Sequence, residues 1–183
     1  MHVEESRVIN QPVQKVFNYV ADTRTLPQWS KPAVEVRDLQ PNKAGELLGE
    51  GAKLTVVHKF LGQRVEELAE VTAYEPNRHV RHWTTGGPMP TELNFIFEEV
   101  PGAGTRLTVS MDTQPEGFAR LIGPVFRRAL KRSIRNDLQT LEEVLDAQAE
   151  WGEERSTSEG HPTEGNREYF RKLIEKTKER SGL

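Results

Sequence analysis

The chain has 183 residues, about the length of one domain. Its 25 Lys and Arg residues against 28 Asp and Glu residues give a net charge of −3, so the whole-chain charge does not indicate nucleic-acid binding. The absence of Cys excludes disulfides and thiolate zinc sites. No apolar run approaches the ~18 residues of a membrane span, and residues 1–7 lack a signal-peptide pattern. We therefore expect a cytoplasmic protein without stable membrane insertion.

The chain begins with one predicted strand and one short predicted helix. Residues 3–9 combine apolar and β-branched side chains, which is typical of a strand. After Pro12, which suits a first helical position, apolar residues recur at the helical spacing at Val13, Val16, Phe17 and Val20. Pro27 then indicates a turn that carries Trp29.

Between residues 33 and 112 the apolar residues recur at every second position. Turns that contain Pro or Gly separate the alternating runs, which predicts antiparallel hairpins with one buried face. With residues 3–9 the pattern predicts about seven strands. In the run 79–85, the alternation places His82 and Thr84 on the buried face and Trp83 on the opposite face.

A helical period returns near Phe118 and continues to about Gln148. Pro124 lacks an N–H donor and crowds the preceding turn, so we expect a kink or break at Gly123-Pro124. The predicted apolar stripe consists of Phe118, Leu121, Ile122, Val125, Phe126, Ala129, Leu130, Ile134, Leu138, Leu141, Val144 and Leu145.

The composition changes after the long helix. Residues 149–165 are rich in Gly, Ser, Thr, Pro and Glu, which predicts a flexible linker. Residues 166–183 could form a short amphipathic helix, with Tyr169, Phe170 and Leu173 on one side. That helix either docks on the domain or is frayed. We therefore predict one folded domain over residues 1–148.

The order of elements predicts the α+β class. Strands and helices are largely segregated along the chain, so a curved antiparallel sheet is expected to wrap around the long C-terminal helix. We expect a ligand cavity between the sheet and this helix.

Four stretches, in this order, resemble a known family. They are residues 9–17 continuing to Pro27-Gln28-Trp29-Ser30; residues 60–64 leading into 70–76; residues 97–100 followed by 104–108; and the Gly123-Pro124 helix with its paired arginines. Over residues 2–148 the chain resembles the polyketide cyclase/dehydrase and lipid-transport family, within the START-like, helix-grip (SRPBCC) superfamily. The resemblance implies a deep, mostly apolar pocket for a hydrophobic small molecule. Some members of that family catalyse and others only bind, so no catalytic residue is carried over.

The residues predicted to line the ligand site lie on the buried face of the strands and on the long helix. His58 and His82 could act as a general base or as a polar anchor, or could be satisfied within the sheet, and no carboxylate that would orient either is evident. Trp29 could wall the pocket or pin the first helix to the sheet. The segment 86–90 could be a lid or a wide hairpin loop. The predicted ligand-binding residues are Trp29, Leu54, Val56, His58, His82, Thr84, Phe95, Val109, Phe126 and Leu130.

The first half of the long helix carries a basic face. Arg128, Lys131, Arg132 and Arg135 fall within an arc of about 100°. Bases early in a helix oppose the helix dipole, so helix stability does not explain them. They could contact an anionic surface (lipid headgroups, RNA or an acidic protein), or they could be a solvated face paired with acids.

We therefore expect a protein that binds or transports a hydrophobic small molecule, such as a lipid, polyketide or quinone-like compound, without catalysis. One alternative is an aromatase/cyclase or dehydratase acting on a polyketide-like substrate. A second is a protein- or ribosome-interaction module that uses the basic face. We expect no cofactor and no metal, because His79 and His82 lie on opposite faces of a strand and no third ligand is near in sequence.

Overall fold

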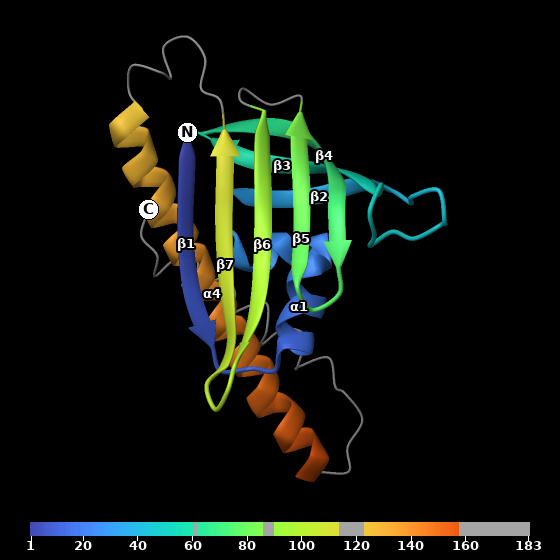
Figure 1. Ribbon diagram of the computed structural model, residues 1–183, viewed down its shortest axis with the longest axis vertical. Coiled ribbons are helices and arrows are strands. Elements are labelled where there is room, and N and C mark those ends of the chain that lie inside the picture. The colour runs from blue at the N-terminus through green and yellow to red at the C-terminus, as the bar shows by residue number, and fades with distance from the viewer. Residues whose placement is uncertain (61, 86–89, 114–122, 158–183) are drawn as a thin grey trace.

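The computed structural model describes residues 1–60, 62–85, 90–113 and 123–157 (Figure 1). Seven strands and a long C-terminal helix are present, as predicted. In chain order the elements are β1 (His2–Ile9), α1 (Val13–Ala21), the 3-10 turn η1 (Thr23–Thr25), α2 (Leu26–Trp29), β2 (Ala33–Gln40), β3 (Lys53–Phe60), β4 (Gln63–Glu75), β5 (His79–Thr85), β6 (Thr91–Val100), β7 (Gly104–Thr113) and α4 (Gly123–Thr157).

The strands form one antiparallel sheet in the order β1-β7-β6-β5-β4-β3-β2. From β2 to β7 each strand pairs with the next one along the chain, because short connections favour hairpins. Irregular pairing between Val71 and Ala73 interrupts the β4–β5 register, and such bulges bend a strand. Figure 1 shows the result: β2 and β3 run nearly across the direction of β5, β6 and β7, so the sheet is strongly curved.

Helices α1 and α4 lie on the same side of this sheet (Figure 1), which confirms the α+β class and the predicted curved sheet. Within α4 the buried side chains are Ile134, Leu138, Leu141, Val144 and Leu145. Asp137 fixes the helix to the segment after α2, because its carboxylate accepts hydrogen bonds from Ser30 Oγ and Lys31 N, each at 3.0 Å.

Several predictions for α4 need correction. The described helix runs from Gly123, so Pro124 lies in its first turn, and the preceding residues on the other side of the expected kink or break lie outside the described residues. The first N–H groups of a helix have no intrahelical partner, so Pro costs little there. The predicted stripe is too wide, because Val125 is 75% exposed and Ala129 is also exposed. The helix continues to Thr157, past the predicted end near Gln148, whereas Phe118, Leu121 and Ile122 lie outside the described residues.

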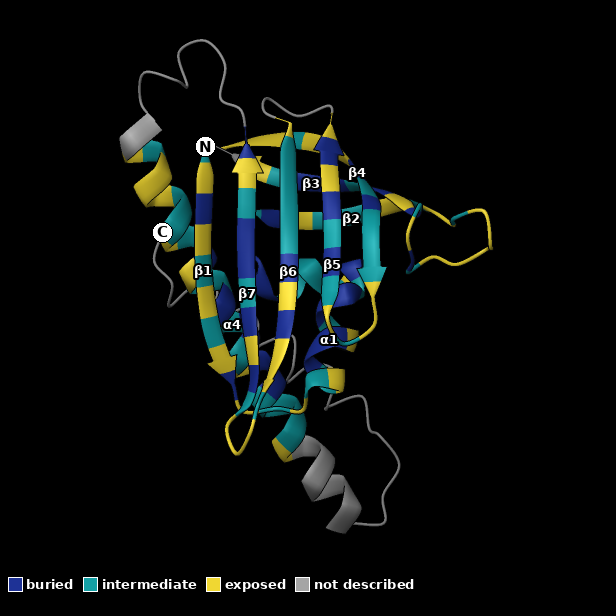
Figure 2. Cartoon of the chain, viewed as in Figure 1, coloured by how far each residue is buried: buried dark blue, intermediate teal, exposed yellow. Residues whose placement is uncertain are grey.

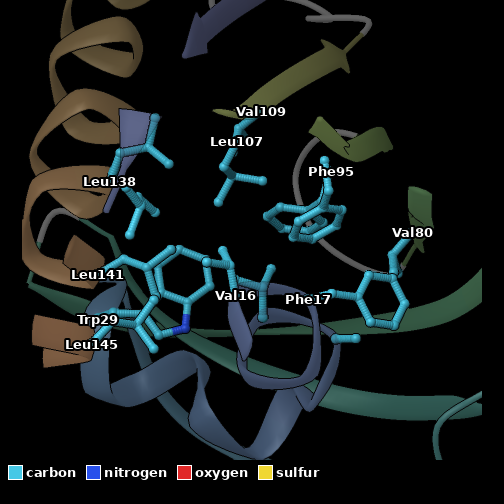
Figure 3. Close-up of a cluster of buried hydrophobic side chains, with 14 of the residues drawn as sticks. Val16, Phe17, Trp29, Val80, Phe95, Leu107, Val109, Leu138, Leu141 and Leu145 are labelled. Carbon is cyan, nitrogen blue, oxygen red and sulfur yellow. The ribbon is translucent and has the colours of Figure 1, made fainter. Parts of the chain in front are cut away.

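One half of the interior is filled by side chains from α1 and α2. Phe17 of α1 packs edge to face against Tyr74 and Phe97, with ring centroids 5.4 and 5.1 Å apart. Trp29 of α2 is 4% exposed and meets Phe95 at 6.3 Å. Figure 3 shows the rings of Phe17, Trp29 and Phe95 gathered with the α4 leucines in one cluster. In this half, the long helix and the sheet are therefore joined by a packed core.

β5 follows the predicted alternation, whereas in β3 Val57 is buried as well as Val56. Val80, His82 and Thr84 of β5 are buried, whereas Trp83 between them is 40% exposed. Side chains of successive strand residues point to opposite faces, so the pattern fixes which of them reach the concave face under the helices.

Among the described helices, none is long and apolar enough to cross a bilayer.

Candidate functional site

The concave face has two halves that differ in packing. Near α1 and α2, the inward residues Val80, Phe95 and Val109 are each at most 5% exposed. The other half lies towards the upper end in Figure 1, where β1 begins and α4 starts, and we refer to it as the upper interior. Here several of the inward residues stay partly accessible, although His82, Thr84 and Thr113 are buried. Figure 2 shows this accessibility in the upper part of β6, and the residues concerned are His58, Val65, Glu67, Thr91, Leu93, Met111, Phe126 and Leu130.

A row of threonines crosses the upper interior. Thr84, Thr91 and Thr113 stand directly opposite one another on β5, β6 and β7. Thr84 Oγ1 donates a hydrogen bond to the Thr91 carbonyl at 3.3 Å. Thr113 is 3% exposed, and its Oγ1 is the one fully buried side-chain polar atom without a partner in the described part of the chain. The row therefore places hydroxyl groups on a face that is otherwise largely apolar.

His82 lies next to this row and is almost completely buried. Its ring is 6% exposed and packs edge to face against Phe95, with centroids 6.0 Å apart. Burial lowers the pKa of His82 to about 4, so the imidazole is neutral near pH 7. Neither ring nitrogen forms a hydrogen bond with a described residue. A neutral imidazole offers one N–H donor and one acceptor nitrogen, and both are therefore open to a bound molecule.

His58 and Glu67 form the second polar feature of the upper interior. The register pairs His58 with Val65 and Val56 with Glu67, which sets His58 and Glu67 diagonally opposite on the concave face. Their Nε2 and Oε2 atoms lie 3.4 Å apart, and the side chains are 28% and 21% exposed. Burial lowers the pKa of His58 and raises the pKa of Glu67. Both shifts favour the uncharged forms of the two groups.

The carboxylate partner of His58 was missed in the sequence, where no orienting carboxylate was evident. The signal is the alternation within β4, in which Val65, Glu67 and Ala69 share one face. Because Ala69 and Val71 of this run are buried, Glu67 had to point towards the interior.

The other predicted wall residues lie on the concave face or on α4, mostly within packed clusters. Leu54 and Val56 belong to a small cluster with Ala33 and Ala69. Trp29 pins α2 against Phe95, and its Nε1 donates to Thr25 Oγ1 at 3.3 Å. Phe126 and Leu130 are half-buried on the first turns of α4. Of the predicted lid, residues 86–89 lie outside the described residues.

Two of the hollows that described residues line lie away from these wall residues. The larger, of about 530 Å³, lies between α1 and the later part of α4 and is lined by residues that include Lys15, Tyr19 and Gln148. Burial raises the pKa of Tyr19 to about 12, and its hydroxyl donates to Gln28 Oε1 at 2.6 Å. The second, of about 350 Å³, lies beside Arg78 and Phe97.

The basic face of α4 is partly used within the fold. Lys131 and Arg135 lie 3.6 and 3.1 Å from the carboxylate of Glu5 on β1. Arg128 and Arg132 are exposed. Two of the four predicted contact residues thus form ion pairs with the sheet. This favours the alternative in which the basic face is paired with acids over the one in which it contacts an anionic surface.

The described ranges contain no group of three His, Asp or Glu side chains that could hold a metal ion. The polar groups of the upper interior are instead separated along β3, β4 and β5. Their arrangement suits hydrogen bonding to an organic molecule and, at the His58–Glu67 pair, the movement of a proton.

Comparison with known proteins gives one family match. The family described as polyketide cyclase / dehydrase and lipid transport matches residues 1–146. Among curated proteins, none matches the sequence.

Solved structures reproduce the whole architecture. A START superfamily protein from Mycobacterium smegmatis has a TM-score of 0.69 at 16% identity, covering 80% of this chain and 98% of its own. The protein TTHA0849 from Thermus thermophilus has a TM-score of 0.68 at 19% identity, covering 81% and 99%. The di-domain ARO/CYC StfQ from the steffimycin biosynthetic pathway has a TM-score of 0.64 at 10% identity, covering 81% of this chain and 51% of its own. At such identities the likeness shows the fold alone, which is the predicted helix-grip fold.

Proposed function

Because the chain belongs to the polyketide cyclase / dehydrase and lipid transport family, we propose that it binds a hydrophobic small molecule in the upper interior, between the sheet and the first turns of α4. The observation that carries the proposal is His82, a buried, neutral imidazole without a hydrogen bond to a described residue. A ligand whose polar group bonds to a ring nitrogen of His82 would use a donor or an acceptor that the fold leaves open, so the site is suited to a molecule with one polar group.

The surroundings of His82 supply the apolar part of the proposed site. Leu93 lies directly opposite His82 on β6, and Met111 lies opposite Leu93 on β7. Leu130 packs against the core from α4. Apolar contact contributes roughly 25 cal/mol for each Å² removed from water, so affinity would come chiefly from these side chains. The histidine would set the orientation of the ligand.

The proposal is tested by solvent extraction of the purified protein followed by mass spectrometry. We expect a copurifying apolar compound that is depleted several-fold from His82→Leu and retained by His79→Leu. His79 is the matched control, because it lies on the same strand but faces away, where it bonds to Asn94 Oδ1 at 2.9 Å. An extract no different from that of an unrelated protein purified in parallel, together with no binding of the neutral dye Nile red, would contradict the proposal.

A catalytic role in the upper interior is the second candidate, and the His58–Glu67 pair favours it. Cyclisation or dehydration of a polyketide-like substrate needs a base that removes a proton next to a carbonyl group. His58 has a lowered pKa and lies 3.4 Å from Glu67, which can orient its ring. A poly-β-ketone mimic should then be converted by the wild type and by His79→Gln but not by His58→Gln. Equal conversion by His58→Gln would count against this candidate.

A further inference from the structure

The charges that face the upper interior are unequal in sign. Among the described residues of β3, β4 and β5 that face the upper interior, the titratable groups are His58, Glu67 and His82, and none is Lys or Arg. On β1, the inward residues Glu5 and Arg7 are already paired, with Lys131 and Arg135 and with Glu142 respectively. The described lining of the upper interior therefore offers a bound molecule one carboxylate and two imidazoles, but no free cation.

The hydrogen-bonding capacity of these groups is also unequal. Glu67 only accepts when ionised, and Nε2 of His58 is already within 3.4 Å of it. The Thr84 hydroxyl donates its hydrogen to the Thr91 carbonyl, so it can only accept. His82 supplies one donor and one acceptor. A ligand hydroxyl can accept from the N–H of His82 and give its own hydrogen to Thr84 Oγ1, whereas a group that only accepts uses the N–H of His82 alone.

We propose that the upper interior selects an apolar molecule whose polar end is an uncharged hydroxyl, aliphatic or phenolic, over the corresponding carboxylate. The inference rests on the proposed binding function. A hydroxyl accepts from the N–H of His82 and donates to Thr84 Oγ1, which lies two residues along the same face of β5. A carboxylate has no hydrogen to donate, and its charge is repelled by Glu67 in a half-buried site where screening by water is weak.

The test compares two ligands of equal length that differ only in the end group. Decan-1-ol and decanoate are titrated at pH 8 against Nile red bound to the wild-type protein. We expect the alcohol to bind at least about tenfold more tightly. In Glu67→Gln the charge repulsion is absent, so decanoate should gain affinity and the ratio should shrink. Glu66→Gln is the matched control, because Glu66 is 59% exposed on the opposite face and pairs with Arg37.

Tighter or equal binding of decanoate by the wild type would overturn the inference while leaving the proposed function intact. An equal change of the ratio in Glu66→Gln and Glu67→Gln would also overturn it, because the effect would then be one of net charge. Failure of Nile red and of both ligands to bind would remove the proposed function and the inference together. The wild-type comparison requires no variant, so it decides the question even if Glu67→Gln does not fold.

Discussion

The imidazole of His82 stands edge-on to the ring of Phe95, with centroids 6.0 Å apart and an angle of 80° between the planes. Phe95 also contacts Trp29, at 6.3 Å. One aromatic side chain therefore joins the packed half of the interior to the upper interior. Edge-to-face pairs contribute about 0.5–1.5 kcal/mol beyond simple burial, so Phe95 both fills the core and holds His82 in place.

Replacement of Phe95 by Ala should lower the free energy of unfolding by about 3–5 kcal/mol, as is usual for a large-to-small change in a core. Phe95 is 5% exposed, and its removal leaves a space beside Trp29. Urea unfolding followed by circular dichroism measures the loss. The adjacent Ile96, which is 39% exposed, gives the control: Ile96→Ala should cost less than about 1 kcal/mol. Similar losses for the two variants would show that Phe95 is not a core residue.

The buried His82 should make stability fall in acid. Its pKa in the fold is about 4 against 6.5 in the unfolded chain, so the unfolded state binds more protons between these values. Stability is therefore full above about pH 6.5 and decreases as the pH falls towards 4, by about 3 kcal/mol in total. Burial of His58 acts in the same direction and burial of Glu67 in the opposite direction, so the dependence of wild-type stability on pH is the sum of these contributions.

A variant isolates the contribution of His82. In urea unfolding between pH 4 and 7, the free energy of unfolding should change less steeply with pH for His82→Gln than for the wild type. The variant lacks one of the groups that take up a proton on unfolding. His79→Gln should keep the wild-type slope, since His79 lies on the outer face and bonds to Asn94. An unchanged slope in His82→Gln would mean that the ring is accessible to water in the fold.

The sequence pattern predicted which side of a strand each residue occupies, but not which residues meet across strands. Alternation placed His82 inside and Trp83 outside because it is a local property of one strand. The His58–Glu67 contact depends on the β3–β4 register, and the contact between Glu5 and Lys131 joins residues far apart in sequence.

The ion pairs of Glu5 should hold α4 against the edge of the sheet. Its side chain is 12% exposed and faces both Lys131 and Arg135. Glu5→Gln leaves two like charges near each other, so we expect a loss of about 1 kcal/mol in urea unfolding at low salt and a smaller loss in 1 M NaCl. Glu4→Gln, on the exposed side of the same strand, should change little. A loss that salt leaves untouched would point to packing of the Glu5 side chain instead of its charge.

The turn between β6 and β7 allows the sharpest comparison, because it contains two glycines with different surroundings. Gly104 has φ +101°, and a Cβ added there would lie 2.2 Å from the Ile9 carbonyl oxygen and 2.8 Å from the Gln11 nitrogen. These neighbours are backbone atoms at the end of β1, which cannot move without breaking the β1–β7 pairing. Gly104→Ala should therefore cost more than about 2 kcal/mol in thermal or urea unfolding.

Gly102 provides the control for that substitution. It has φ +74°, and a Cβ added there would meet nothing within 4 Å. Gly102→Ala should cost only the left-handed backbone strain of about 1 kcal/mol. Equal losses at the two positions would mean that strain alone, and not the close approach of β1, requires glycine at residue 104. A larger loss at 104 would show that the end of β1 is held directly against this turn, which fixes the edge of the sheet on which α4 rests.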